Sequence, residues 1–228
     1  MKRIVVEYVE SLDSLDHNGL YCHFDSYGHR HRIGCVNWPG QFPAKPQASF
    51  AILRSATALY VDFKVTGNYL RAVNFKNLSP VAQDSCVEFF LSPTADNHYF
   101  NFEFNCIGAV NASHRSRRDC PTRLTDDEIK SIRRYPSVGT EPFDERGGVH
   151  SWRLTVAIPI SLLELDNRHF PASMTGNFYK CGGLTSEPHY LSWNPISSPK
   201  PDFHITADFG KLLFKGLSIN STFKKMSK

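Results

Sequence analysis

The chain has 228 residues, of which 41% are hydrophobic and 13% aromatic, and its formal net charge is +4. This is enough apolar material for one sizeable core, so we expect a single domain over 1–228 with its core at about 33–214. Basic residues are scattered, apart from Arg115-Ser116-Arg117-Arg118 and Lys224-Lys225. This scatter argues against nucleic acid as a partner, and no apolar run is long enough for a membrane span.

The N-terminus begins like a signal peptide, but Glu7 and Glu10 interrupt its apolar stretch. We therefore expect a strand at 2–9 and a cytoplasmic protein, or a secreted or periplasmic one if a signal was removed. Residues 10–32 are expected to be irregular. Their histidines have no carboxylate or cysteine at a suitable ligand spacing, which favours a polar surface loop over a metal site.

Alternating or apolar runs separated by turn residues predict many short strands. They are expected at 33–38, 48–54, 58–66, 68–75, 85–91, 98–106, 150–158, 188–193 and 203–214. Two short helices are expected, one starting at Thr125 with a capping box to Glu128 and one near 161–165 with Ser161 as its cap. This pattern predicts an all-β, antiparallel, jelly-roll-like β-sandwich with one or two short helices in an insertion.

The strongest pattern is a hairpin formed by 85–91 and 98–106, with turn residues at 92–97. Alternation in its second strand places aromatic side chains in the core and a polar row on the other face. The expected register sets Glu88 opposite Asn101, with Glu103 as a diagonal neighbour. The core side is Phe100, Phe102, Phe104 and Cys106, and the other side is Tyr99, Asn101, Glu103 and Asn105.

None of the six cysteines forms a Cys-x-x-Cys pair, so the usual zinc spacing is absent. Cys86 and Cys106 are expected on opposite strand faces, which argues against a bond between them. Most of the cysteines are interpreted as small buried hydrophobes, and disulfides are left open.

The polar row suits a polyhydroxylated ligand, because amide and carboxylate groups can each bind neighbouring hydroxyls. Arg71 is expected to join it and to brace Glu88. Trp193, Trp38 and Tyr99 are candidate aromatic platforms, whereas Trp152 alternates with core residues and is expected to be buried. No nucleophile elbow, phosphate loop or His-Glu-x-x-His motif is present, so a catalytic function has little support.

Four motifs resemble the carbohydrate-binding family 9-like proteins, relatives of the family 9 modules attached to xylanases, over roughly 33–214. They are Asp84-Ser85-Cys86-Val87-Glu88-Phe89-Phe90, Asn101–Gly108, Gly176–Gly182, and Ser192-Trp193-Asn194-Pro195 with Pro201-Asp202-Phe203-His204. The resemblance implies a β-sandwich that binds the end of a sugar chain between two tryptophans. It also implies a bacterial role in carbohydrate catabolism, and structural calcium in some members.

Only part of that pattern is present in this sequence. Glu88 matches the glutamate of the family, but the expected clamp tryptophan falls on Ala82, and Trp193 is the candidate for the second clamp residue. We therefore predict non-catalytic carbohydrate binding by Glu88, Arg71, Asn101, Glu103, Asn105 and Trp193. The rivals are a glycoside hydrolase or glycosidase subunit using Glu88 and Glu103, and a structural or protein-interaction sandwich without a sugar.

Overall fold

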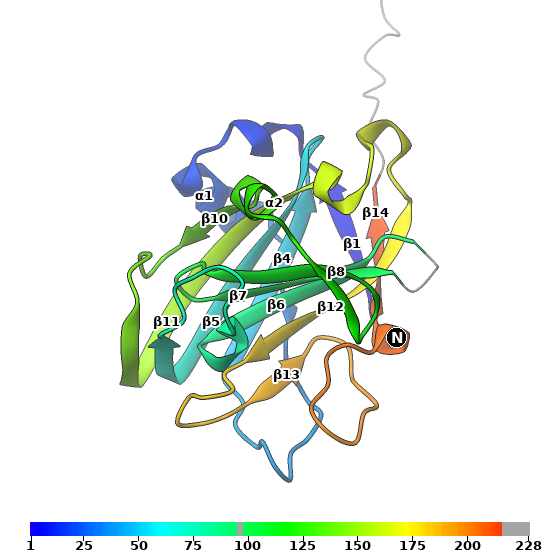
Figure 1. Ribbon diagram of the computed structural model, residues 1–228. Helices are drawn as coiled ribbons and strands as arrows, with labels where there is room; N and C mark the ends of the chain where they lie inside the picture. Colours follow the sequence, from blue (N-terminus) through cyan, green and yellow to red (C-terminus); the bar gives the residue numbers. More distant parts are fainter. Residues whose placement is uncertain (95–97, 216–228) are drawn as a thin grey trace, which may run out of the picture.

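The structure is a computed structural model that describes residues 1–94 and 98–215 (Figure 1). The helices are α1 (His17–Tyr27) and α2 (Asp126–Ser131), with 3-10 turns that include η2 (Val81–Gln83). The strands are β1 (Arg3–Tyr8), β2 (His31–Arg32), β3 (Cys35–Val36), β4 (Gln47–Arg54), β5 (Ala58–Ala72), β6 (Cys86–Ser92), β7 (Tyr99–Asn105), β8 (Val110–Arg117), β9 (Cys120–Arg123), β10 (Arg133–Pro136), β11 (Phe143–Pro159), β12 (Ser173–Cys181), β13 (Tyr190–Ser192) and β14 (Gly210–Phe214).

The strands form two layers joined along β1. One layer has the order β10-β11-β5-β4, and the other has the order β14-β12-β6-β7-β8-β9, with β13 beside β12. In Figure 1, β6, β7 and β8 cross over β4 and β5. β1 pairs in parallel with β14 and then with β4, whereas the other pairings of the described strands are antiparallel. The predicted β-sandwich is confirmed, with β1 as its parallel element.

Aromatic side chains from both layers meet in the core. The Phe178 ring stacks on Phe50 at 3.5 Å and on Phe89 at 4.6 Å between ring centroids. The predicted core residues of the hairpin are buried here too, and so is Trp152. The face assignment of the hairpin is therefore confirmed.

The register of the hairpin differs from the prediction by two residues. Glu88 lies opposite Glu103 rather than Asn101, and Phe89 lies opposite Phe102. A shift of two keeps every side chain on its face, so the hydrophobic pattern cannot distinguish the two registers. The turn selects between them, and its residues 95–97 lie outside the described part of the chain, as do Lys224 and Lys225.

Several predicted boundaries were wrong. The expected strands 58–66 and 68–75 form one continuous strand, β5, because Gly67 keeps its place opposite His150 in the ladder with β11. Only the last five residues of 203–214 form a strand, and 203–209 belong to a loop with a 3-10 turn. β8, β9, β10 and the central strand β12 were not predicted.

The region expected to be irregular contains α1. Asp16 caps this helix by accepting a hydrogen bond from the Gly19 amide at 2.7 Å, and Leu20 and Phe24 pack on the outer face of β4 and β5. The helix at Thr125 is confirmed, with its capping box. The second predicted helix does follow Pro159, as expected, but it is a short 3-10 turn, Ile160–Leu163, whose N-cap is Pro159 and not Ser161.

All six cysteines are free. Cys86, Cys106 and Cys181 are buried, whereas Cys22 and Cys120 are exposed. No helix in residues 1–94 and 98–215 has the length and apolar character needed to cross a membrane.

Candidate functional site

A pocket of about 180 Å³ lies on the outer face of β6, β7 and β12, next to the loop 194–209. Two carboxylates, two partly exposed aromatic rings and a polar rim line it. The residues are Glu88, Glu103, Ala82, Tyr190, Phe203, Arg118, Cys181, Pro201, Asp202 and His204. We call this cavity the carboxylate pocket.

The two carboxylates are direct neighbours across β6 and β7. Glu88 is 3% exposed and Glu103 is 8% exposed. Burial raises the pKa of both groups, and for Glu88 the nearby Cys181 and Glu103 raise the pKa further. Such a pair holds a proton more readily than free carboxylates and can both donate and accept hydrogen bonds.

Their hydrogen bonds differ. Glu103 accepts from the side-chain amides of Asn101 at 3.1 Å and Asn111 at 3.0 Å, one at each oxygen. The Glu88 carboxylate has one side-chain contact in the described residues, to the Cys181 sulfur at 2.9 Å. Glu88 therefore keeps more free acceptor capacity toward the pocket.

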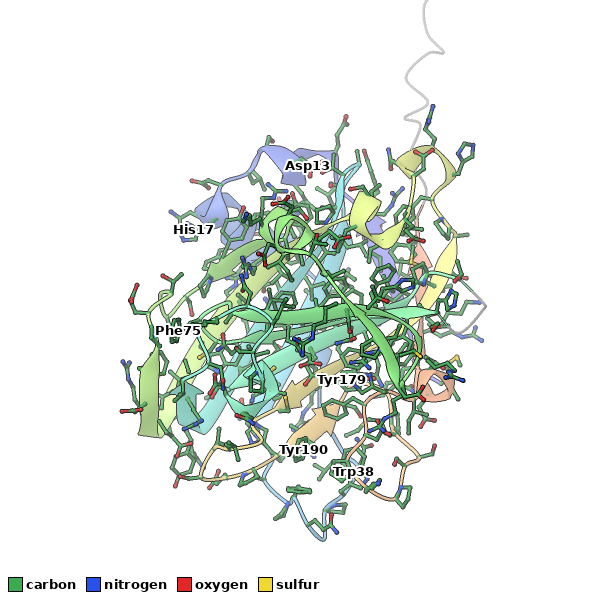
Figure 2. The ribbon with its side chains drawn as sticks, viewed as in Figure 1. Asp13, His17, Trp38, Phe75, Tyr179 and Tyr190 are labelled. Carbon is green, nitrogen blue, oxygen red and sulfur yellow. The ribbon has the colours of Figure 1, made fainter. Side chains whose placement is uncertain are left out.

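The aromatic wall comes from the loop 194–209 and from β13. Phe203 stacks on the buried Tyr179 ring at 4.1 Å, and the Tyr179 hydroxyl donates to the Phe203 carbonyl at 3.0 Å. Tyr190 packs edge-on against Phe203 at 6.1 Å. Tyr179 and Tyr190 lie on the same side of the molecule as Trp38 (Figure 2).

The rim of the pocket carries charge and a fixed histidine. Arg118 forms an ion pair with Asp202 at 3.0 Å. His204 hydrogen-bonds the Tyr99 hydroxyl at 2.9 Å, and burial lowers its pKa to about 4. His204 is therefore neutral near pH 7 and adds no charge to the pocket.

The other predicted polar residues support the pocket rather than line it. Asn101 holds Glu103 on one side and accepts from Ser113 at 2.6 Å and Arg115 at 2.8 Å on the other. Arg71 pairs with Asp84 at 3.3 Å, not with Glu88 as expected.

Asp84 connects this network to the pocket wall. It also accepts from Asn105 at 3.0 Å and follows η2 directly, the turn that carries Ala82. Arg71 and Asn105 therefore fix the segment that forms one wall of the carboxylate pocket.

The structure does not place Trp193 at the pocket. Trp193 is 3% exposed and packs edge-on against Phe50 and Phe178, each at 5.9 Å, on the core side. Gly210 lies directly under its ring, where a Cβ could not fit. Leu191 and Trp193 share one face in a period of two, a signal that could have indicated the core position.

The other candidate platforms are also buried. Trp38 is 6% exposed and donates through Nε1 to the Ser198 carbonyl at 2.8 Å, which fixes the loop beside Phe203. Tyr99 is 2% exposed. The aromatic residues that line the pocket are Phe203 and Tyr190, neither of which was predicted as a platform, and the sequence placed Phe203 in a strand.

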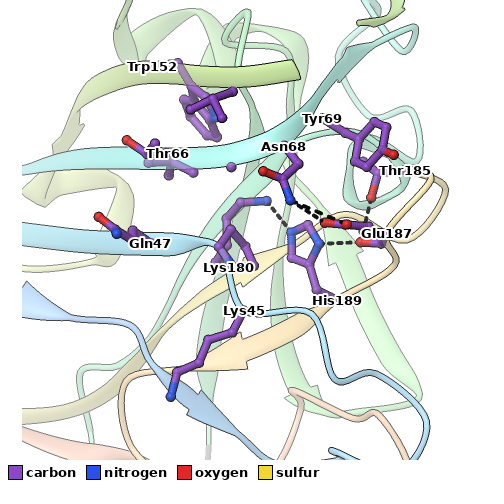
Figure 3. Close-up of a pocket in the computed structure, with 14 residues that line it drawn as sticks. Lys45, Gln47, Thr66, Asn68, Tyr69, Trp152, Lys180, Thr185, Glu187 and His189 are labelled. Carbon is purple, nitrogen blue, oxygen red and sulfur yellow. Dashed lines mark hydrogen bonds between the residues drawn. The ribbon is translucent and has the colours of Figure 1, made fainter. Parts of the chain in front are cut away.

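A second cavity, of about 320 Å³, opens at the edge between the two layers (Figure 3). Its ionisable lining residues include Lys45, Lys180, Glu187 and His189, and the Lys180 ammonium hydrogen-bonds His189 Nε2 at 2.7 Å. Burial lowers the pKa of both groups, to about 3 for His189, where the Lys180 charge lowers it further. Trp152 in its wall is only 4% exposed, and Tyr69 is the partly exposed aromatic residue of this cavity.

The structure has one candidate metal-ligand group among its described residues. It consists of Cys86, Glu88 and Cys181, whose ligand atoms all lie within 4.8 Å of one another. Calcium requires oxygen ligands, six to eight of them. Two of these three ligands are thiols, so the group does not fit the calcium implied by the sequence resemblance.

Comparison with known proteins agrees with the sandwich architecture. Residues 26–214 match carbohydrate-binding family 9. A crystal structure of a proposed carbohydrate-binding protein from Bacteroides uniformis is 34% identical, with a TM-score of 0.87, covering 94% of this chain and 99% of that one. No curated protein matches the chain.

Two more distant structures share the fold. Both are family 9 carbohydrate-binding modules from Caldicellulosiruptor kristjanssonii and are 17% identical to this chain. The complex with cellotriose has a TM-score of 0.61 and covers 96% of this chain and 97% of its own. The complex with glucose has a TM-score of 0.59, and the match covers 97% of this chain and 100% of that one. From the family match, which spans most of its length, and the 34% identical relative, the chain belongs to carbohydrate-binding family 9.

Proposed function

We propose that this protein binds carbohydrate without chemical turnover, at the carboxylate pocket. The observation that carries the proposal is the pairing of Glu88 with a partly exposed aromatic ring, Phe203, in one pocket. A sugar has an apolar ring face and a rim of hydroxyls, and this pocket offers a partner for each. The family, and the sugars bound in the two Caldicellulosiruptor complexes, support the same ligand class.

The size of the pocket favours one terminal sugar unit. Its volume of about 180 Å³ is below the roughly 300–1,000 Å³ typical of sites for drug-sized ligands. Ala82 leaves one side of the pocket without an aromatic ring, so few contacts offset the cost of ordering the ligand. We expect a dissociation constant on the order of 0.1–1 mM.

Calorimetric titration with glucose, cellobiose and cellotriose tests this proposal. Phe203→Ala and Glu88→Gln should each weaken binding at least about tenfold, that is, by ~1.4 kcal/mol. Phe75→Ala is the matched control, because Phe75 is 57% exposed and lies away from Tyr179 and Tyr190 (Figure 2). Equal binding by all variants would place the site elsewhere, and no binding at tens of millimolar would favour the structural rival.

The hydrolase rival depends on Glu88 and Glu103. Their raised pKa values suit a general acid, but the side-chain amides on Glu103 occupy both of its oxygens. Release of reducing sugar that disappears in both Glu88→Gln and Glu103→Gln, with folding intact, would favour an enzyme.

A further inference from the structure

Three side chains with metal-ligand atoms converge beside the carboxylate pocket. Cys86 and Cys181 are directly opposite each other on β6 and β12, and Glu88 is two residues from Cys86 on the same face of β6. All three are buried, and their ligand atoms lie within 4.8 Å of one another. Two adjacent strands thus build a compact group of two sulfurs and one carboxylate.

Within residues 1–94 and 98–215, no cationic side chain forms a hydrogen bond or ion pair with these three groups. The one side-chain hydrogen bond of Glu88 in the described residues comes from Cys181. Lys180 is close, but its ammonium donates to His189 Nε2 and to the Cys181 carbonyl instead. The three ligand groups are therefore not taken up by an ion pair within the described residues, and two sulfurs and a carboxylate remain available to a metal ion.

We propose that Cys86, Glu88 and Cys181 bind one zinc ion, with a fourth position open to the carboxylate pocket. Zinc accepts mixed sulfur and oxygen ligands in tetrahedral geometry. Zinc–sulfur bonds of about 2.3 Å require neighbouring ligand atoms roughly 3.5–3.8 Å apart. The Cys181 sulfur and the nearer Glu88 oxygen, now 2.9 Å apart, would have to separate slightly, and no ligand-atom pair exceeds 4.8 Å.

The surroundings of the three ligands leave the fourth position of the zinc ion accessible and provide a positive charge nearby. Glu88 and Cys181 both line the carboxylate pocket, so water or a ligand hydroxyl can reach the fourth position. Zinc binding displaces the thiol protons. Two thiolates and one carboxylate exceed the charge of the ion by one, and the nearby Lys180 ammonium offsets that excess.

Zinc binding is best measured in a protein without its accessible thiols. The background is Cys22→Ser, Cys35→Ser and Cys120→Ser, because these three cysteines are exposed or partly exposed. The reduced, metal-free protein is titrated with Zn²⁺ against a chromophoric chelator, and separately with Co²⁺. We expect one ion per chain, with the thiolate charge-transfer and tetrahedral ligand-field absorption of cobalt.

Variants identify the ligands. Cys86→Ser and Cys181→Ser should abolish the cobalt spectrum, and Glu88→Gln should weaken zinc binding at least about tenfold. Cys106→Ser is the matched control, since Cys106 is a buried free thiol on the core side, and it should retain the ion. Circular dichroism checks that each variant is folded.

A further measurement needs no variant of Cys86, Glu88 or Cys181, so its result does not depend on whether such variants fold. Zinc should raise the thermal midpoint of the background protein in proportion to its binding. The proposal is overturned if the reduced background protein binds no ion, or if Cys86→Ser and Cys181→Ser bind as well as the control. Sugar titration of the metal-free protein tests the proposed function separately, so either proposal can fail alone.

Discussion

Ala82 is the residue at which the pocket departs most from a two-sided aromatic clamp. It lines the carboxylate pocket together with Phe203, and the family resemblance places a tryptophan there. We predict that Ala82→Trp tightens sugar binding by about fivefold to tenfold, that is, ~1–1.4 kcal/mol, since a second ring can pack on the sugar. Calorimetry with glucose and cellobiose measures the change.

A bulk control separates stacking from simple filling of the pocket. Ala82→Leu adds volume without an aromatic face and should not tighten binding. If Ala82→Trp binds no better than wild type, or if Ala82→Leu gains as much, a sugar does not stack against this wall.

His189 should make stability depend on pH. Burial and the Lys180 charge lower its folded-state pKa to about 3, against about 6.5 in an unfolded chain. Between these values only the unfolded chain binds the proton, so stability present above about pH 6.5 is lost as the pH falls toward 3, by about 1 kcal/mol per unit.

The groups facing His189 are the Lys180 ammonium at Nε2 and the Glu187 carbonyl at Nδ1. His189→Gln keeps an acceptor for Lys180 but cannot titrate. Urea unfolding at pH 7, 6, 5 and 4 should therefore show a smaller fall in the free energy of unfolding for this variant than for wild type. His204, with its pKa lowered to about 4, contributes a second loss that remains in the variant. An unchanged pH slope would contradict this account.

At the scale of elements, the β6–β7 hairpin supplies both the core and the pocket. Phe102 is fully buried and lies opposite Phe89. We predict that Phe102→Ala lowers the free energy of unfolding by about 3–5 kcal/mol, through lost burial and the cavity left behind. Denaturant unfolding measures it, and a cost below about 0.5 kcal/mol would mean that the ring is not packed.

This hairpin also shows how far the sequence could lead. Period-two alternation identified its faces, because one face is apolar and the other polar. It left the register open by two residues, because such a shift preserves the faces. The helix α1 was not predicted, because only Leu20 and Phe24 of its residues are buried. Two apolar positions are too few to show a clear helical period.

The candidate site was predictable only in part. Glu88 and Glu103 were found because they lie on one alternating hairpin. Phe203 enters the pocket on an irregular loop, and Cys181 meets Cys86 through β12, a strand that was not predicted. Contacts made between distant segments leave no local periodicity from which they could be inferred.

At the scale of the molecule, β1 joins the two layers. Arg3–Val6 pair with β14, and Glu7–Tyr8 pair with β4. Every path of hydrogen-bonded strands from one layer to the other in the described residues passes through this element. Both layers also share one core cluster, which includes Val6. We therefore predict that the chain unfolds as one cooperative unit.

Val6 and its neighbour Val5 offer a matched test of this joint. Val6 is fully buried, whereas Val5 is 45% exposed. Val6→Ala should lower the free energy of unfolding by about 2 kcal/mol, from lost burial and a cavity, and Val5→Ala by less than about 0.5 kcal/mol.

Tryptophan fluorescence reports on the core near Trp152 and Trp193, and far-ultraviolet circular dichroism reports on the whole sheet. The two transitions should coincide in wild type and in both variants, because a defect in β1 weakens both layers together. Separated transitions would instead mean that the layers unfold independently and that β1 is not the element that couples them.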